Sequence, residues 1–313
     1  MKRVAFLFPG QGSQAVGMAK AFYDEYAEIR ELFEQADDLL GEKLTRLMFE
    51  GPKEELTETE NAQPALLLAG IAVQKLFIKE NIQPIMAAGH SLGEYSALVA
   101  AGSLSFEEAL PLVSKRGKLM EEAFPKGQGS MAAVLGMSQD YIEQTLESLH
   151  DDHVVDIANL NCPGQIVISG SKEGIDAAKD HLKEKGAKRV LPLNVSGPFH
   201  SRLMKPANEQ FATELEHITF SDTDIPVYAN VTAEPVTDKD SVKDLLIRQL
   251  YSPVRFEESI HNMMNDGVDV FVELGTGKVL SGLVRKIDRK TKTFAVQDPD
   301  SLKEFLTWYR EES

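Results

Sequence analysis

Blocks of apolar and polar positions alternate along most of the chain. Residues 4–8 form an unbroken apolar run that ends at Pro-Gly, which predicts a buried strand and is too short for the core of a signal peptide. An acidic amphipathic stretch covers about residues 18–40 and predicts helix, whereas the polar segment 50–64 predicts a loop. Residues 65–80 predict a helix, and 85–88 predict a short strand. Strands that alternate with helices favour a parallel sheet covered on both faces.

From residue 127 the pattern changes. Strand patterns at 127–137, 153–162, 164–170 and 187–195 and helix patterns at 138–150 and 172–186 give the order βαββαβ. The alternation then returns, with a strand at 225–230, a helix near 241–250 and a strand at 268–275. We therefore expect an α/β fold with a hydrolase-like parallel-sheet core, residues 1–126 and 197–313, and an inserted ferredoxin-like βαββαβ subdomain, residues 127–196.

Composition narrows the classes of molecule that this chain is expected to bind. The 313 residues include 33 Lys and Arg against 49 Asp and Glu, a net charge of −16 that disfavours non-specific binding to nucleic acid or to an anionic membrane. The single cysteine, Cys162, cannot form an internal disulfide, which fits a reducing compartment. No stretch approaches the roughly 20 apolar residues of a membrane span. We expect a cytoplasmic protein that is a monomer.

The segment "GHSLG" carries the first candidate for chemistry. It places Ser91 between Gly89 and Gly93, after a predicted strand and before a predicted helix, which is the pattern of a nucleophile elbow. The helix N-terminus and the Leu92 amide then face any oxyanion formed there. A strand-to-helix turn of small residues without chemistry remains an alternative, because five-residue motifs recur by accident.

A nucleophilic serine requires a base, and His200 is the best candidate. It lies in the Gly-Pro loop "SGPFHS", directly after the predicted inserted subdomain. His90 is adjacent to Ser91, but neighbours on such a turn point in different directions, so we expect a structural role. The other histidines stand in polar surroundings typical of a solvated surface: His150, His153, His181, His217 and His261.

The segment "GTGK" at 275–278 suggests a phosphate-binding loop. The Walker pattern needs four residues between Gly and Gly-Lys, and the dinucleotide pattern needs glycine where Leu280 stands. Neither nucleotide motif is satisfied.

Seven motifs together carry a resemblance that covers essentially the whole chain. They are "FPGQGSQ" (8–14), "GHSLGE" (89–94), Arg116 in "KRGKLM", "NCPGQIVISG" (161–170), "GPFHS" (197–201), "RQLYSPVRF" (248–256) and "ELGTGKVL" (273–280). In this order they resemble the malonyl-CoA:acyl carrier protein transacylase family. The resemblance implies transfer of a malonyl group from malonyl-CoA to the phosphopantetheine thiol of acyl carrier protein, with neither metal nor cofactor.

The resemblance also implies roles for individual positions. Ser91 matches the acylated nucleophile and His200 its base, oriented by a backbone carbonyl in the stretch that contains Gln249. The amides of Gln11 and Leu92 match the oxyanion hole. Further positions match contacts to the substrate: Arg116, which would pair with the malonyl carboxylate, Gln63, Asn161, and Phe199, where relatives that select methylmalonyl tend to have serine.

Two other functions remain open at this stage. A serine hydrolase or thioesterase acting on acyl thioesters shares the G-x-S-x-G pattern, and a non-catalytic acyl- or CoA-binding module could share the fold. An acidic carrier protein would need a basic patch on this acidic chain. The candidate patches are Lys188 with Arg189, and Arg285 with Lys286, Arg289, Lys290 and Lys292.

Overall fold

The computed structural model describes residues 2–149 and 153–311 as an α/β fold with two sheets. The larger sheet has six strands in the order β10-β9-β1-β2-β7-β8. All its neighbours pair in parallel except β7 and β8, which are antiparallel. Its strands are β1 (Val4–Phe8), β2 (Met86–Gly89), β7 (Val227–Tyr228), β8 (Pro235–Val236), β9 (Val270–Leu274) and β10 (Lys292–Val296).

Both faces of the larger sheet are buried, as the apolar run of β1 predicts. Val4, Phe6 and Phe8 belong to the hydrophobic core on one face, whereas Ala5 and Leu7 belong to a second core on the other face. Alternate residues of a strand point to opposite faces, so an uninterrupted apolar run is what a sheet between two helical layers requires.

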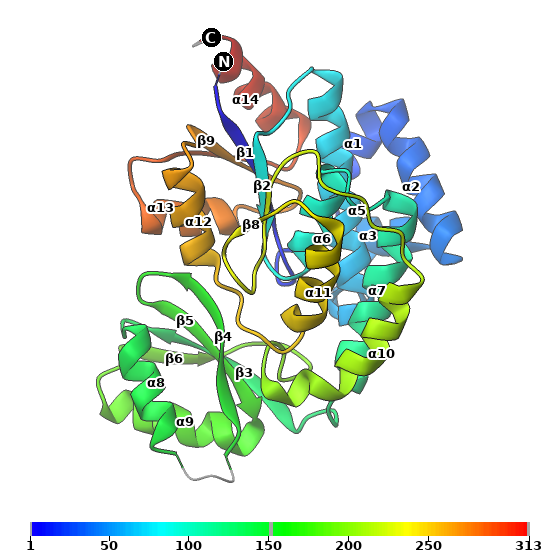
Figure 1. Cartoon of the computed structure of the whole chain (residues 1–313). Helices are drawn as coiled ribbons and strands as arrows, with labels where there is room; N and C mark the ends of the chain where they lie inside the picture. Colours follow the sequence, from blue (N-terminus) through cyan, green and yellow to red (C-terminus); the bar gives the residue numbers. More distant parts are fainter. Residues whose placement is uncertain (1, 150–152, 312–313) are drawn as a thin grey trace.

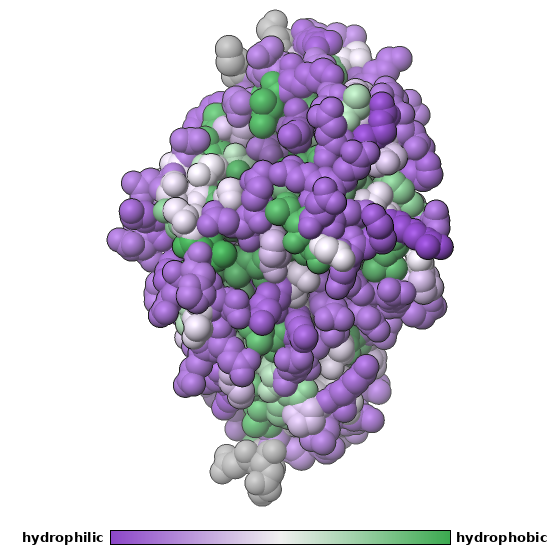
Figure 2. Space-filling view, turned by 90° about the vertical axis from the view of Figure 1, so that its right-hand side faces the viewer, coloured by the Kyte–Doolittle hydropathy of each residue, from purple (hydrophilic) through white to green (hydrophobic). Residues whose placement is uncertain are grey.

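Helices cover each face of this sheet (Figure 1). On the first face lie α1 (Lys20–Glu25), α2 (Ala27–Leu40), α3 (Leu44–Glu50), α4 (Lys53–Thr57), α5 (Thr59–Lys79), α6 (Leu92–Ala100), α7 (Phe106–Glu122), α10 (Lys205–Glu216), α11 (Lys239–Gln249) and α14 (Pro299–Glu311). The second face is covered by α12 (Phe256–Asn265) and α13 (Val279–Ile287). Figure 2 shows the outer side of the first helical layer as mainly polar, with separate small apolar areas, which fits amphipathic surface helices.

The second sheet has four strands in the order β4-β5-β3-β6, all antiparallel. Its strands are β3 (Gly129–Leu135), β4 (Val155–Cys162), β5 (Gln165–Ser171) and β6 (Arg189–Pro192), and α8 (Gln139–Glu147) and α9 (Lys172–Glu184) cover one face. In Figure 1 this unit lies at one end of the molecule, opposite α14. The predicted order βαββαβ is confirmed for the elements described.

Three details differ from the sequence prediction. The segment 50–64, predicted to be a loop, contains α4 and the first turn of α5. The stretch 18–40 divides into α1 and α2 because Tyr26 adopts an extended conformation (φ −112°, ψ 121°) between them. The larger sheet is mixed, since the short strand β8 returns antiparallel to β7 through a tight connection.

Helix α5 also corrects the expectation that no stretch approaches a membrane span. Residues Thr59–Lys79 have the length and the hydropathy of such a span, but 83% of their most apolar window is buried inside the protein. This helix packs against α6 and α7 in the core. Its apolar character is therefore explained by burial on all sides.

Candidate active site

Ser91 lies on a sharp turn between β2 and α6. Its backbone adopts φ 50° and ψ −105°, an uncommon conformation for a residue other than glycine. A Cβ atom at Gly89 would lie 1.9 Å from the carbonyl carbon of Gly93, and one at Gly93 would lie 2.0 Å from the carbonyl oxygen of Phe8. Neither position has space for a side chain, so the two glycines allow the close turn that presents Ser91.

His200 reaches Ser91 from a loop more than one hundred residues further along the chain. Its Nε2 lies 2.8 Å from the Ser91 Oγ, and its Nδ1 lies 2.9 Å from the main-chain oxygen of Gln249. The ring is 4% exposed, and this burial, with the nearby charge of Arg116, lowers the pKa of His200 to about 3. The imidazole is therefore neutral at neutral pH, as a base must be before it accepts a proton.

Arg116, on α7, places a buried positive charge beside this pair. The guanidinium donates to the Gln63 Oε1 at 2.8 Å, to the Gln249 Oε1 at 2.9 Å and to the Ser91 Oγ at 3.2 Å. All three acceptors are neutral, and within the described residues Arg116 makes no ion pair although it is fully buried. A buried cation without an anionic partner is costly, so the position is suited to the carboxylate of a ligand.

A second set of buried polar groups lies behind Ser91. Oε2 of Glu94 accepts from the Gln249 Nε2 at 2.7 Å and from the Asn230 main-chain amide at 3.0 Å. Asn230 accepts from the Ser91 amide at 2.8 Å and donates to the Gly89 carbonyl at 2.7 Å. Burial raises the pKa of Glu94 to about 7. Sequence reasoning missed Glu94 and Asn230, although "GHSLGE" contains the first of them.

A cavity of about 450 Å³ opens onto this constellation. The predicted residues Gln11, Gln63, Leu92, Arg116 and Phe199 line it together with Ser91 and His200. Within the described chain neither the Gln11 nor the Leu92 main-chain amide donates a hydrogen bond, which leaves both available for an oxyanion. The volume fits a ligand of modest size with part of a longer chain.

Asn161 is the predicted substrate contact that the structure places elsewhere. It does not line the cavity; its Oδ1 lies 2.8 Å from the His90 Nε2, whereas Asn159 is the asparagine in the lining. Register shifts in β4 between residues 157 and 159 and between 160 and 162 disturb the simple alternation of sides. Asn161 therefore contacts His90, which itself lines the cavity and whose ring lies 5.8 Å from that of Phe256. A structural role for His90 stays a prediction.

The remaining predicted positions lie away from the cavity. His181, His217 and His261 are exposed and His153 is half-buried, while His150 lies outside the described residues. Lys188, Arg189, Arg285, Lys286, Arg289, Lys290 and Lys292 are all exposed. Within residues 2–149 and 153–311, no group of three or more His, Cys, Asp and Glu side chains is arranged to hold a metal ion.

Known proteins resemble this chain along its whole length. Residues 5–296 match the family described as the acyl transferase domain. A malonyl CoA-acyl carrier protein transacylase of Bacillus subtilis is 52% identical over 100% of this chain and 99% of its own length, and one from Staphylococcus aureus is 47% identical over 97% and 98%.

Solved structures agree with these sequence matches. An acyl carrier protein S-malonyltransferase from Vibrio cholerae is 44% identical, covers 97% of this chain and 100% of its own, and has a TM-score of 0.95. A malonyl-transacylase solved in complex with its type II polyketide synthase acyl-carrier protein is 41% identical, covers 96% and 98%, and has a TM-score of 0.94.

Proposed function

This chain belongs to the acyl transferase domain family, and from that membership we infer that it transfers the malonyl group of malonyl-CoA to the phosphopantetheine thiol of acyl carrier protein. Relatives at 52% and 47% identity along the whole chain carry the name of this activity. The reaction supplies the extender unit for fatty acid synthesis. The residues that perform it are proposed from the geometry of the site.

The buried guanidinium of Arg116 beside Ser91 and His200 is the observation that carries the choice of substrate. Malonyl-CoA offers a free carboxylate two carbons from the thioester, which can replace the neutral acceptors Gln63 and Gln249 as a two-point partner of Arg116. An acetyl group has no carboxylate that could pair with this cation. The carboxylate also offsets the positive charge that lowers the pKa of His200, so binding of malonyl-CoA strengthens the base.

In the first half-reaction, the His200 Nε2 takes the proton of the Ser91 hydroxyl as Oγ attacks the thioester carbonyl carbon. The amides of Gln11 and Leu92 donate to the oxyanion, each worth about 3 kcal/mol at such sites. The Gln249 carbonyl accepts from the Nδ1–H and stabilises the imidazolium. The carbon–sulfur bond then breaks, His200 returns the proton to sulfur, and malonyl-Ser91 remains.

In the second half-reaction, the phosphopantetheine thiol gives its proton to the His200 Nε2 while its sulfur attacks the ester carbonyl. The same two amides hold the new oxyanion. Collapse breaks the carbon–oxygen bond to Ser91, which recovers a proton from His200. The products are malonyl-carrier protein and free enzyme, and Ser91 and His200 have returned to their starting protonation states.

A serine hydrolase and a non-catalytic binding module are the alternatives, and one experiment separates all three. Intact-protein mass spectrometry after mixing with malonyl-CoA is expected to show stable malonylation of Ser91, discharged by holo acyl carrier protein. Rapid production of free malonate without carrier protein would indicate a hydrolase. Absence of an adduct on a folded protein would indicate a binding module. Ser91→Ala is the matched control, because it removes only the attacking oxygen.

The finer description of the fold is also a proposal. The six-stranded sheet with helices on both faces and Ser91 at the end of β2 supports a hydrolase-like core, built from residues 1–126 and 197–313. The antiparallel order β4-β5-β3-β6 with two helices on one face supports a ferredoxin-like subdomain at 127–196. Limited proteolysis near residues 126 and 196 tests these limits.

For the carrier protein, Lys188 and Arg189 form the better-supported docking patch. They lead into β6, and the residues after that strand, Leu193 to Val195, line the catalytic cavity. Charge reversal at this pair is expected to raise KM for carrier protein and leave KM for malonyl-CoA unchanged. The matched comparison is charge reversal at Arg285 and Lys286 on α13. A larger increase in KM for carrier protein there would assign the docking patch to α13 instead. A monomeric state, a cytoplasmic location and activity without a cofactor stay predictions.

A further inference from the structure

His200 is held in a conformation that its own backbone does not favour. Its φ of 58° lies in the left-handed region, which non-glycine residues adopt only when the surrounding structure enforces it. The catalytic distance to the Ser91 Oγ therefore depends on whatever fixes the neighbouring backbone. The segment that follows His200 supplies the candidates.

Two sets of hydrogen bonds fix this segment. Within the loop, the Ser201 Oγ donates to the Pro198 carbonyl at 2.6 Å. From outside the loop, Asp156 on β4 accepts from the main-chain amide of Arg202 at 2.8 Å and from the Arg202 Nε at 2.9 Å. Asp156 thus contacts the backbone only two residues after the base, from a strand of the other sheet.

The same strand also contacts the segment that follows Gln249, whose carbonyl is the partner of the His200 Nδ1. The Val254 amide donates to the Ala158 carbonyl at 2.8 Å, and the Leu160 amide donates to the Val254 carbonyl at 2.9 Å. Val254 lies five residues after Gln249, whose carbonyl accepts from His200. One strand, β4, therefore contacts the segments that follow both partners of the hydrogen bond that orients the base.

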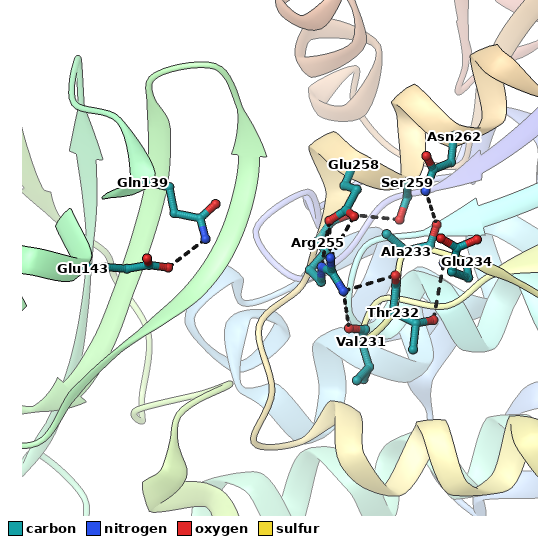
Figure 3. A network of polar contacts seen from close by, with 10 residues as sticks. All are labelled: Gln139, Glu143, Val231, Thr232, Ala233, Glu234, Arg255, Glu258, Ser259 and Asn262. Carbon is teal, nitrogen blue, oxygen red and sulfur yellow. Dashed lines mark hydrogen bonds and ion pairs between the residues drawn. The ribbon is translucent and has the colours of Figure 1, made fainter. Parts of the chain in front are cut away.

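The segment after Gln249 is anchored at its far end as well. The Arg255 guanidinium donates to the carbonyls of Val231 and Thr232 and pairs with Glu258 in α12 (Figure 3). The segment that follows the Gln249 carbonyl is therefore held by several contacts that do not involve the loop of His200. On the His200 side, Asp156 provides a contact from the four-stranded sheet.

We propose that Asp156 is a positioning residue that holds the strained His200 backbone in register with the Gln249 carbonyl. This role rests on the proposed acyl transfer through Ser91 and His200. Asp156 does not line the catalytic cavity, and its side chain bonds to Arg202 and not to Ser91 or His200. The important contact is the one to the Arg202 main-chain amide, because the Arg202 side chain is 62% exposed and an exposed ion pair contributes little.

The proposal ranks three variants. Asp156→Ala removes every contact to Arg202, Asp156→Asn keeps an oxygen that can accept from the main-chain amide, and Arg202→Ala keeps the contact of that amide to Asp156. We expect Asp156→Ala to lower the single-turnover rate constant of Ser91 malonylation about tenfold, since small misplacements of a catalytic group are costly. Asp156→Asn and Arg202→Ala are expected to lose about threefold or less.

The measurements are the single-turnover rate constant of Ser91 malonylation, kcat and KM for malonyl-CoA, the malonylated fraction of Ser91 at completion, and Tm. The proposal requires a lower kcat, a KM within about twofold of wild type and full malonylation at completion. Glu80→Ala is the matched control, because it removes a similarly exposed Arg–carboxylate pair, with Arg310, far from the site. It is expected to keep the wild-type rate.

Two results would overturn the proposal: an Asp156→Ala enzyme with the wild-type rate, or a loss that follows the fraction of inactive protein and is matched by a lower Tm. Failure of the wild-type protein to form malonyl-Ser91 would instead contradict the proposed function. The two failures are therefore distinguishable in one set of experiments.

Discussion

The carboxyl end of the larger sheet and the core of the four-stranded sheet are built in opposite ways. Around Ser91 the buried side chains are polar: Gln63, Glu94, Arg116, His200, Asn230 and Gln249. The core of the four-stranded sheet consists of aliphatic residues and Met137 on β3, β4, β5, α8, α9 and the adjoining segments. One region contains groups that are expensive to bury, whereas the other contains groups that gain from burial.

This difference teaches where stability and chemistry reside. Hydrogen bonds join these side chains and keep Ser91, His200 and Arg116 in fixed positions at the cavity. The aliphatic core supplies rigidity to β4 and to the wall of the cavity. Substitutions in the two regions should therefore separate loss of activity from loss of stability.

The largest expected effect comes from the base. His200→Ala is expected to reduce malonyl transfer by about 10³-fold or more with little change in Tm, because no other proton acceptor lies within reach of the Ser91 Oγ in the described chain. Steady-state kinetics and a thermal melt measure the two quantities. If His90→Ala is inactive while His200→Ala retains activity, the assignment of the base is wrong.

The next effect concerns the carboxylate partner. Arg116→Ala is expected to lower kcat/KM for malonyl-CoA by about 10²- to 10³-fold and to narrow the preference over acetyl-CoA, since the buried pair with the substrate is lost. Arg116→Lys, which keeps the charge but not the planar fork, should be intermediate. An alanine variant that still strongly prefers malonyl would contradict the assignment.

A core substitution in the other region tests the opposite side of the comparison. Ile168, fully buried on β5, pairs with Ala132 on β3 and Ile157 on β4. Ile168→Ala is expected to lower the free energy of unfolding by about 3 kcal/mol and to leave kcat of the folded enzyme within about twofold. Denaturant titration and kinetics measure this, with Ile168→Val as the milder control. A large loss of kcat at unchanged stability would break the comparison.

Selectivity against a branched acyl group is expected to change less. Phe199 lines the cavity beside His200, and we expect its ring to crowd a methyl branch on the central carbon of the malonyl group. Phe199→Ser is expected to raise kcat/KM for methylmalonyl-CoA relative to malonyl-CoA by about 10- to 100-fold, the usual worth of a methyl group in an apolar pocket. Competition between the two thioesters measures the ratio. An unchanged ratio would place the determinant elsewhere.

The smallest effect is a pH dependence of stability. Burial raises the pKa of Glu94 from 4.5 to about 7, so the folded state binds this proton more tightly than the unfolded chain does. The contribution of Glu94 to stability is therefore present below pH 4.5 and is lost as the pH rises through about 7. Glu94→Gln, which keeps an acceptor for Asn230 and Gln249 but does not titrate, should become more stable relative to wild type as the pH rises from 5 to 8. Parallel Tm curves for both proteins would show that Glu94 does not titrate in this range.

Much of the site could be predicted from short segments. Gly89 has a local steric reason, its close approach to Gly93, that a five-residue motif records, and His200 stands in a distinctive Gly-Pro loop. Gly93 is required by the Phe8 carbonyl of β1, a contact that the motif does not contain. Glu94 and Asn230 could not be paired from the sequence, because their contact joins α6 to the segment just after β7, 136 residues away. The exchange of Asn161 for Asn159 in the cavity depends on irregularities of β4 that no residue pattern announces.

The sequence by itself determined the alternation of strands and helices, the βαββαβ insertion, the elbow at Ser91 and the acidic balance of the chain. These follow from local rules: the side-chain period, turn geometry and the space that glycine leaves. Only the tertiary structure decided that Arg116 is a buried cation with no anion paired to it among the described residues, that Glu94 and Asn230 meet behind Ser91, and that Asp156 reaches the loop of the base. Burial and charge pairing depend on which distant segments pack together, because the cost of a charge is set by its surroundings and not by its neighbours in the chain.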